Sequence, residues 1–312
     1  MSAATDEYLL ALGRYLFNSG YHYTAVTPAT HEFNNARAAN RRAADMRDIF
    51  GWSRPFERAT LSDEEFELMH HAEVLLPHGQ VWRSALRWSS LSGLLFAHSA
   101  YPTEADDSVF FGPDTYRFAS FIEAYLQGTD EPLARAVDIG CGSGAGAILV
   151  ARAWPEAEVL GVDINPQALR LTAINAKLAG TANVKAMHSN LLGDVEGDFD
   201  LIIANPPYMM DTQERAYRHG GGELGAGLSF QIVESALKRL APGGTLLLYT
   251  GIAIVNGHDG FLQALRERLN NERCSWHYRE IDPDVFGEEL IKPVYAEVER
   301  IAAVGLTLVR DS

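Results

Sequence analysis

The feature that most constrains the fold is a regular alternation of apolar strands and amphipathic helices from about residue 134 onward. RAVDIG (residues 135–140), EVLGVDI (158–164) and FDLIIA (199–204) are typical of buried strands, and AGAILVARAW (145–154) is typical of a helix between two of them. This alternation predicts a parallel, doubly wound α/β sheet with helices on both faces. The last two expected strands, at 274–281 and 298–309, have no helix between them. We therefore expect a seven-stranded Rossmann-like sheet that ends in an antiparallel hairpin with a reversed edge strand.

The first third of the chain follows another pattern. Helical periodicity covers residues 6–18, and a second helix is expected from about 28 to 50. A third helix is expected over 61–76, with Ser62 as N-cap, Glu65 completing a capping box and Pro77 ending it. Residues 81–100 then read as two strands around a turn near 89–92. Helices followed by a hairpin resemble a winged helix.

The polar stretch 100–109 separates these two patterns. We place a domain boundary there, which divides the chain into an N-terminal, mostly helical, winged-helix-like domain for substrate recognition (residues 1–105) and a catalytic domain (residues 106–312). A turn leading into an amphipathic helix, residues 110–126, opens the second domain.

Composition excludes several classes of protein. The chain has no apolar run near the ~18 residues of a membrane span, and its N-terminus lacks a signal-peptide pattern. We expect a soluble, cytoplasmic protein without a membrane partner. Cys141 and Cys274 form no disulfide framework, and the absence of CxxC and HExxH motifs predicts no metal site. His70 and His71 are interpreted as part of a solvated helix face.

The formal net charge is −15, which argues against broad binding to nucleic acid because that affinity comes mainly from neutralising phosphates. A local basic patch stays compatible with this charge. Between residues 37 and 58 the chain has six arginines against three acids: Arg37, Arg41, Arg42, Arg47, Arg54 and Arg58 against Asp45, Asp48 and Glu57. We interpret this cluster as an exposed helix face with ion pairs.

A glycine-rich turn follows the first strand of the alternating region. Gly140, Gly142 and Gly144 in VDIGCGSGAG allow a sharp turn and bring backbone N–H groups and a helix N-terminus against a ligand. Asp163, followed by Ile164, stands at the next strand tip, where a carboxylate can hold ribose hydroxyls. This spacing fits NAD and other adenosine cofactors equally well.

Two further stretches favour one of these cofactors. Asp138 gives the pattern D-x-G-x-G-x-G, which resembles motif I of Rossmann-like (class I) S-adenosylmethionine-dependent methyltransferases. Its carboxylate either braces the loop or meets the ligand. In that fold the loop SNLLGDV (189–195) flanks the adenine, so Asn190 and Leu191 are candidate adenine contacts; the alternative for Asn190 is an ordinary Asx turn.

The stretch ANPPYMMD (204–211) leaves the strand FDLIIA through an amide, two prolines and an aromatic ring. Asn205-Pro206-Pro207-Tyr208 resembles the [D/N/S]-P-P-[Y/F/W] motif of methyltransferases that alkylate planar nitrogens. The Asn205 side-chain oxygen and the Pro206 carbonyl can accept the two N–H bonds of such a nitrogen and orient its lone pair. The prolines stiffen this geometry, and Tyr208 can stack on the planar group.

The resemblance extends to release-factor glutamine methyltransferases of the HemK type and the "methyltransferase small domain" group. PDTYRF (113–118) is similar to a segment that borders the cofactor site there, which implies Thr115, Tyr116 and Arg117 as contacts of the methionine end. Residues 220–244 resemble the stretch after NPPY, and the loop 209–227 is expected to close over substrate. The N-terminal part and the tail after residue 278 do not resemble that family, which leaves the acceptor open.

Three functions stay open on the sequence. The first is an S-adenosylmethionine-dependent N-methyltransferase acting on a protein amide or a small molecule, which the acidic composition favours. The second is the same chemistry on an RNA or DNA base, supported by the arginine cluster. The third is a cofactor-sensing DNA-binding regulator, which an intact NPPY motif disfavours.

Overall fold

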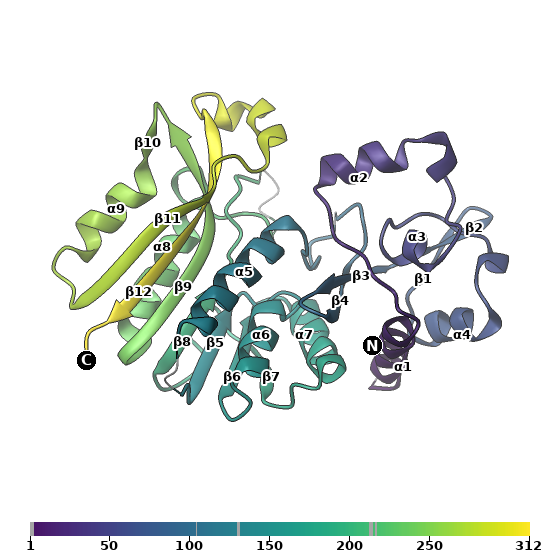
Figure 1. Ribbon diagram of the computed structural model, residues 1–312. Coiled ribbons are helices and arrows are strands. Elements are labelled where there is room, and N and C mark those ends of the chain that lie inside the picture. Colours follow the sequence, from purple (N-terminus) through teal and green to yellow (C-terminus); the bar gives the residue numbers. More distant parts are fainter. Residues whose placement is uncertain (1–2, 104, 130–131, 212–214, 216) are drawn as a thin grey trace.

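The computed structural model describes residues 3–103, 105–129, 132–211, 215 and 217–312. Its N-terminal part is built from short helices followed by two hairpins (Figure 1). These elements are α1 (Ala3–Asn18), α2 (Pro28–Asn35), η1 (Ala38–Asn40), α3 (Met46–Phe50), η2 (Arg58–Thr60), α4 (Asp63–His71), β1 (Leu75–His78), β2 (Val81–Ser84), β3 (Leu86–Leu91) and β4 (Leu94–Ser99).

The remainder of the chain forms the large sheet and its helices. These elements are α5 (Pro113–Gln127), β5 (Arg135–Ile139), α6 (Ala145–Ala153), β6 (Glu158–Asp163), α7 (Pro166–Ala179), β7 (Val184–His188), β8 (Phe199–Ala204), η3 (Glu223–Gly225), α8 (Gly227–Arg239), β9 (Leu240–Val255), β10 (His258–Asp259), α9 (Gly260–Leu269), β11 (Cys274–Asp282), η4 (Gly287–Ile291), η5 (Pro293–Tyr295) and β12 (Arg300–Arg310).

The strand order is β11-β12-β9-β8-β5-β6-β7, and the short β10 pairs with β9. Strands β7, β6, β5, β8 and β9 are parallel, whereas β12 runs antiparallel to both β9 and β11. The predicted Rossmann-like α/β sheet is therefore confirmed. The position of the reversed strand was wrong, because β12 lies inside the sheet and β11 forms the edge. Strand β9 is long enough to pair with β12 from Thr245 to Ile254, and this pairing places β12 between β9 and β11.

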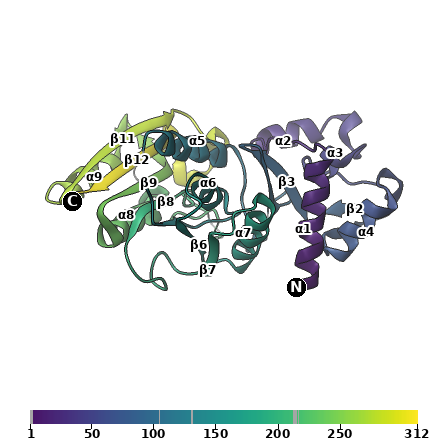
Figure 2. The same ribbon diagram turned by 60° about the horizontal axis from the view of Figure 1, so that its bottom comes forward.

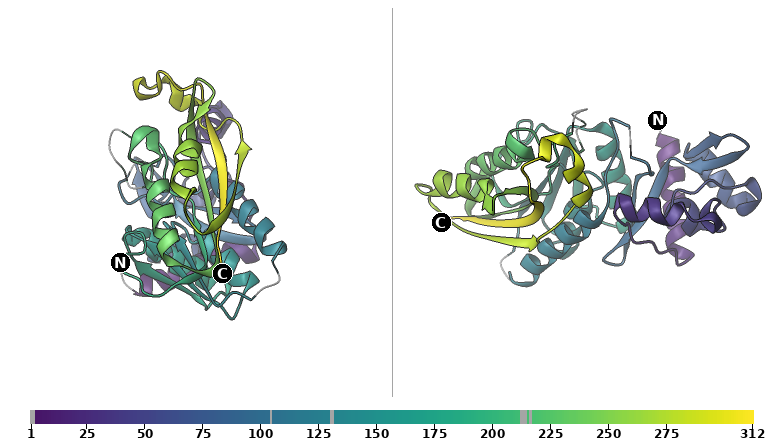
Figure 3. Two further views of the ribbon diagram at one scale, coloured as in Figure 1. Left: turned by 90° about the vertical axis from the view of Figure 1, so that its left-hand side faces the viewer. Right: turned by 90° about the horizontal axis from the view of Figure 1, so that it is seen from above.

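Helices cover both faces of the sheet, because successive strand residues point to opposite sides. On β5, Ala136 packs in the core under α5 and α6, whereas Val137 packs in the core shared with α8 and α9. The right-hand view of Figure 3 shows α5 on one side of the sheet and the green α8 and α9 on the other. The parallel strands place their carboxyl ends at one edge, where open α/β sheets bind ligands.

The N-terminal part packs directly on α7, which lies beside α1 in Figure 2. Leu9, Trp88 and Leu171 belong to one buried core that crosses from the N-terminal helices to α7. The buried Asn175 side chain of α7 accepts a hydrogen bond from Ala97 N–H and donates one to the Ala97 carbonyl, at 2.9 and 3.0 Å. The two parts of the chain therefore share a hydrophobic core, and the domain boundary between residues 105 and 106 stays a proposal that rests on the sequence pattern.

Three local expectations in the N-terminal part need correction. The helix expected over 28–50 is broken into α2, η1 and α3, and Asp45 caps the last of these. The capping box of Ser62 and Glu65 is confirmed, but α4 ends at His71. Pro77 lies in strand β1, opposite Trp82, instead of terminating the helix. The two strands expected over 81–100 around a turn near 89–92 are also only partly correct, because residues 86–91 and 94–99 form the hairpin of β3 and β4 around residues 92–93, whereas β2 pairs with β1.

The arginines of the cluster differ in their partners, and Arg47 lies over the ring of Tyr23. Arg54 pairs with Asp48 and Arg58 pairs with Asp63. The exposed residues Arg37, Arg41 and Arg42 have no carboxylate within 4.0 Å in the part of the chain that the structure describes. The ion-paired helix face is therefore only partly present. Among the described residues, no helix has the length and apolarity that crossing a bilayer requires.

Candidate active site

A cavity of about 230 Å³ lies at the carboxyl edge of the sheet, between the glycine-rich turn, the tips of β6 and β8 and the start of α5. Most of the residues that the sequence singles out line it: Thr115, Asp138, Gly140, Gly142, Asp163, Ile164, Asn190, Leu191, Asn205, Pro206, Pro207 and Tyr208. Gly144, Tyr116 and Arg117 do not line it. The cavity thus combines the two motifs that the sequence places far apart.

The glycine-rich turn needs glycine for its backbone. Gly140, Gly142 and Gly144 have φ angles of +70°, +54° and +80°, which side chains on L-residues disfavour. A Cβ atom at Gly140 would have no neighbour within 4 Å, so the space beside this backbone is open to a ligand. Gly144 instead approaches Thr172 of α7, and a Cβ atom would stand 2.9 Å from its methyl carbon.

Asp138 braces the turn. Its Oδ2 accepts a hydrogen bond from Ala147 N–H in the first turn of α6 at 2.9 Å. Burial, opposed by this hydrogen bond and aided by the nearby charge of Asp163, raises the pKa of Asp138 to about 7. A Cβ atom at Gly146 would stand 2.7 Å from the same oxygen, so glycine is required there for Asp138 to reach the helix.

Asp163 lies beside this turn at the tip of β6. Its carboxylate accepts hydrogen bonds from Gly142 N–H at 3.0 Å and Asn165 N–H at 2.9 Å. Each carboxylate oxygen can accept a further hydrogen bond. Ile164, half exposed, continues the rim. The open backbone at Gly140, this carboxylate and the largely apolar lining fit an adenosine cofactor, and Asp163 is the group suited to its ribose hydroxyls.

The NPPY turn follows β8 and presents two unused acceptors. In the part of the chain that the structure describes, no hydrogen bond ends on the Asn205 side chain or on the Pro206 carbonyl. Both residues line the cavity. Unpaired acceptors at a cavity wall are available to the N–H groups of a ligand.

Tyr208 is anchored rather than free. Its hydroxyl donates to Asp114 Oδ2, and its ring packs so tightly on Gly251 of β9 that a Cβ atom there would lie 2.0 Å from the ring. Only 6% of the residue is exposed. The structure therefore gives its ring an anchoring contact, and stacking of Tyr208 on substrate stays a prediction.

Asp114 is the main site residue that the sequence reasoning missed. It lies in the first turn of α5, lines the cavity, and accepts hydrogen bonds from both Tyr208 and Tyr249, the latter at 2.7 Å. Arg117, 3.2 Å from Asp114 and 2.7 Å from Asp282, balances its charge. Burial raises the pKa of Asp114, which these partners oppose. Its position in PDTYRF was the available signal, but only the fold shows which side chain of that segment turns inward.

The other residues of that segment have structural partners. Thr115 lines the cavity and its hydroxyl accepts a hydrogen bond from Gly112 N–H at 3.2 Å. Tyr116 points away, and its hydroxyl accepts from Ala25 N–H at 2.9 Å, which ties α5 to the N-terminal part. Neither Tyr116 nor Arg117 lines the cavity, so their positions do not support the predicted contact with the cofactor.

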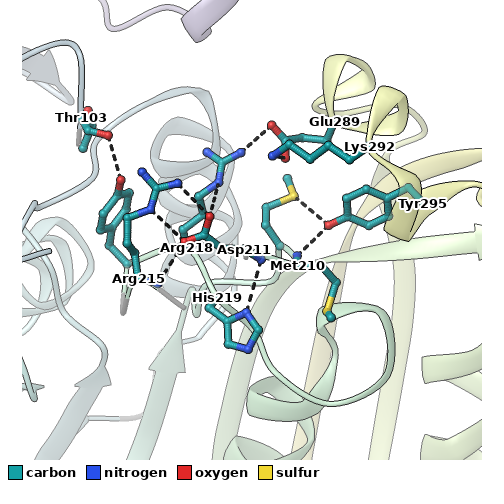
Figure 4. Close-up of polar contacts among 11 residues, drawn as sticks. Thr103, Met210, Asp211, Arg215, Arg218, His219, Glu289, Lys292 and Tyr295 are labelled. Carbon is teal, nitrogen blue, oxygen red and sulfur yellow. Dashed lines mark hydrogen bonds and ion pairs between the residues drawn. The ribbon is translucent and has the colours of Figure 1, made fainter. Parts of the chain in front are cut away.

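The loop after NPPY contributes Met209, Tyr217 and Arg218 to the cavity wall, and Figure 4 shows polar contacts within and around this loop. Asp211 accepts two hydrogen bonds from the Arg215 guanidinium, each 2.8 Å long, which hold the pKa of Asp211 at about 2. Tyr217 donates to the Thr103 carbonyl at 2.8 Å. Tyr217, Arg218 and Phe286 line the cavity and were also missed. Residues 212–214 and 216 of the predicted closing loop lie outside the described residues.

Comparison with known proteins identifies the family. Residues 122–275 match the family described as "Methyltransferase small domain". The matched segment is a methyltransferase small domain. This segment therefore has the fold and cofactor class of S-adenosylmethionine-dependent methyltransferases, and the predicted resemblance, sheet and cofactor are confirmed.

Three relatives illustrate the range of acceptors in this group. The chain is 40% identical over 125 residues to a release factor glutamine methyltransferase of Deinococcus radiodurans, covering 36% of this chain and 44% of that one. It is 34% identical over 133 residues to a ribosomal protein uL3 glutamine methyltransferase of Neisseria meningitidis, covering 39% and 44%. It is 33% identical over 141 residues to a 4-amino-L-phenylalanine/4-methylamino-L-phenylalanine methyltransferase of Streptomyces pristinaespiralis, covering 42% and 48%. The chain thus spans a little less than half the length of these relatives.

Proposed function

We propose that this chain is an S-adenosylmethionine-dependent N-methyltransferase whose acceptor is a glutamine-type amide of a protein. The observation that carries the proposal is the pair of unused acceptors, the Asn205 side-chain oxygen and the Pro206 carbonyl, at the wall of the cavity. Two acceptors on consecutive residues match in number the two N–H bonds of a primary amide. Two of the relatives named above bear the name glutamine methyltransferase.

The residues of the site act mainly by orientation. S-adenosylmethionine, when bound, supplies an electrophilic methyl carbon, and Asp163, Asn190 and Leu191 are the residues proposed to hold its adenosine part. An amide nitrogen is a poor nucleophile because its lone pair is delocalised. Asn205 and Pro206, by accepting both N–H bonds, would turn the lone pair toward the methyl carbon and disperse the positive charge that develops on nitrogen. The proton that the nitrogen then loses is acidic, so no strong base is required.

Two variants separate the acceptor role from the cofactor role. Asn205→Ala is expected to keep the thermal stabilisation by S-adenosylmethionine but to lose methyl transfer from labelled cofactor into cell extract. Asn190→Ala is expected to weaken that stabilisation. Transfer by Asn205→Ala within a few-fold of the natural protein would refute the proposed role of the amide.

A second candidate acceptor is a small aryl amine. The relative from Streptomyces pristinaespiralis is named for such a substrate, and aromatic side chains of Tyr217 and Phe286 line the cavity. A nucleic-acid base is the third candidate. Its support is the exposed trio Arg37, Arg41 and Arg42, which has no carboxylate partner among the described residues, although the net charge of −15 opposes it. Division of the labelled product into protein, RNA and small-molecule fractions distinguishes all three.

A further inference from the structure

Residues 33–47 run from the end of α2 through η1 to the start of α3, and we call this stretch the arginine loop. It contains four exposed arginines, Arg37, Arg41, Arg42 and Arg47, and one acidic residue, Asp45. None of the four guanidinium groups has a carboxylate within 4.0 Å anywhere in the described ranges of the chain. The arginine loop is therefore a local positive surface on a chain whose net charge is −15.

The groups that shape the arginine loop bond to one another. Asn34 Oδ1 accepts hydrogen bonds from Asn40 Nδ2 at 2.9 Å and from Arg54 Nη2 at 2.7 Å. Asp48, which pairs with Arg54, accepts a hydrogen bond from Ala44 N–H at 3.0 Å. The backbone of the loop is thus fixed by other residues than its four exposed arginines. Because the loop is already ordered, binding of an anion to these arginines costs little backbone entropy.

An exposed aromatic ring stands beside these charges. Phe33 is 75% exposed and precedes Arg37 by four residues. The backbone stays helical through Ala36, with φ −67° and ψ −18°, so Phe33 and Arg37 lie about one turn apart on the same side of α2. In single-stranded nucleic acids, phosphates pair with guanidinium groups and bases stack on aromatic rings. A free ring next to unpaired arginines matches these two kinds of group.

Contacts connect the arginine loop to the cavity. The Tyr101 hydroxyl donates to Glu32 of α2, next to Phe33, at 2.6 Å. Two residues further along the chain, the Thr103 carbonyl accepts a hydrogen bond from Tyr217, which lines the cavity. Figure 1 shows α2 at the upper end of the molecule, which is also the end where β9 turns into β10. A ligand held on the arginine loop therefore lies at the end of the molecule that holds the cavity.

The shape of the arginine loop favours a single strand over a duplex. Three of its arginines flank η1, which has three residues and is too short to lie along a major groove as a recognition helix. A flexible strand adapts to such a surface, and RNA exposes unstacked bases in its single-stranded loops. The net charge of −15 opposes this binding only weakly, because charges more than about 8 Å away are largely screened at physiological ionic strength.

We propose that the arginine loop and Phe33 form a binding site for single-stranded RNA, in which Arg37, Arg41 and Arg42 pair with phosphates and Phe33 stacks on a base. This inference goes beyond the proposed function, because it assigns a partner to the N-terminal part of the chain. It holds whether the methyl acceptor is the RNA itself or a protein bound to that RNA. The site lies outside the matched segment, which begins at residue 122.

The test measures binding of the full chain to a fluorescently labelled single-stranded RNA of about 16 nucleotides by anisotropy. Three phosphate contacts predict that the affinity falls about 20-fold between about 50 and 200 mM salt. The triple variant Arg37→Ala, Arg41→Ala, Arg42→Ala should bind at least about 10-fold more weakly at the lower salt concentration. Its remaining binding should depend little on salt, because the charged contacts are gone.

Two matched controls separate the site from the charge and apolarity of the whole surface. Lys238→Ala, Arg266→Ala, Arg273→Ala removes three exposed positive charges from α8, α9 and the turn before β11, and should change the affinity by less than about 2-fold. Phe33→Ser should weaken binding about 5-fold or more and keep the salt dependence, since stacking involves no ion. Phe17→Ser, which changes a side chain 53% exposed on α1, should leave binding unchanged.

The melting temperature of each variant separates loss of binding from misfolding. Lack of RNA binding by the natural protein, or equal weakening in the two triple variants, would overturn the proposal. Equal displacement of the labelled RNA by duplex DNA or by a glutamate-rich peptide would overturn the choice of single-stranded RNA. Normal RNA binding without methyl transfer into any fraction of a cell extract would instead overturn the proposed function and leave the RNA site standing.

Discussion

The hydrogen bonds to Asp114 allow the anchoring of the NPPY turn to be tested with a matched pair of variants. Tyr208 and Tyr249 each donate one hydrogen bond to the same buried carboxylate, but only Tyr208 belongs to NPPY. Tyr208→Phe and Tyr249→Phe each remove a single hydroxyl and keep the ring. The two variants therefore lose the same type of interaction at the same acceptor.

Their stabilities should fall by similar amounts. A hydrogen bond to a charged group contributes about 1.5–3 kcal/mol, and a domain of this size shifts its melting temperature by roughly 2–4 °C per kcal/mol. Thermal unfolding is therefore expected to move by about 3–12 °C in each variant. The remaining tyrosine and Arg117 still balance Asp114, so neither variant leaves the carboxylate without a partner.

Their activities should differ. Displacement of a positioning group by about 1 Å can reduce a rate about 100-fold, and loss of the Tyr208 anchor frees the backbone that carries the Pro206 carbonyl. We expect kcat to fall about 10-fold or more in Tyr208→Phe and to stay within about 3-fold in Tyr249→Phe. Methyl transfer from labelled cofactor and a melting curve measure both quantities. Equal losses of kcat in the two variants, or no loss in Tyr208→Phe, would refute the anchoring argument.

Three more predictions concern the cofactor side. S-adenosylmethionine or its demethylated product should raise the melting temperature while NAD should not, and no shift with the first two at saturation contradicts the cofactor assignment. The pKa of Asp138 is about 7 in the folded protein, so the unfolded chain loses this proton at lower pH, and the stability of the natural protein falls as pH rises from about 4 to 7. The Asp138→Asn variant has no titrating group at this position, so its stability relative to the natural protein should increase across this window. A constant difference in stability between the two proteins excludes the raised pKa. Gly146→Ala, whose Cβ would lie 2.7 Å from Asp138 Oδ2, should weaken cofactor binding, whereas Gly128→Ala, with no neighbour closer than 3.6 Å, should not.

The large sheet was predictable because its signal is repeated many times. Most strands from β5 to β9 are short apolar runs followed by a helix with one apolar face, and these patterns agree with one another along the chain. The position of β12 carried no such signal. Its residues are apolar on both faces in either arrangement, and only pairing with β9 decides whether it lies at the edge.

Pro77 shows a limit of local rules. A proline after a helical pattern usually ends the helix, yet here the helix ends earlier and Pro77 occupies a short strand that pairs on one side only. Edge strands tolerate proline because its missing donor faces away from the partner. The outcome depends on the pairing of residues 75–78 with residues 81–84, which the helical periodicity of residues 61–76 does not reveal.

The candidate site was predictable where its residues belong to motifs and hidden where they do not. Asn205, Asp163 and the glycines come from patterns whose spacing fixes their place in a parallel sheet. Tyr217, Arg218 and Phe286 reach the cavity from segments without a periodic pattern, and Asp114 reaches it from the start of a predicted helix whose inward-facing residue the sequence does not identify. Their inward orientation depends on long-range packing, such as the contact of Tyr208 with Gly251.

The insertion of β12 between β9 and β11 affects the order in which the protein can assemble. Strand β11 precedes β12 in the chain but joins the sheet only through β12, which pairs with β9. Pairing of distant segments is slow because loop closure costs entropy before contacts form. The connection between these two strands, residues 283–299, is therefore expected to be among the last parts to reach its place. A folding intermediate with the parallel strands formed and β12 not yet in place would leave the edge of β9 exposed, and that edge would be its weakest point against aggregation.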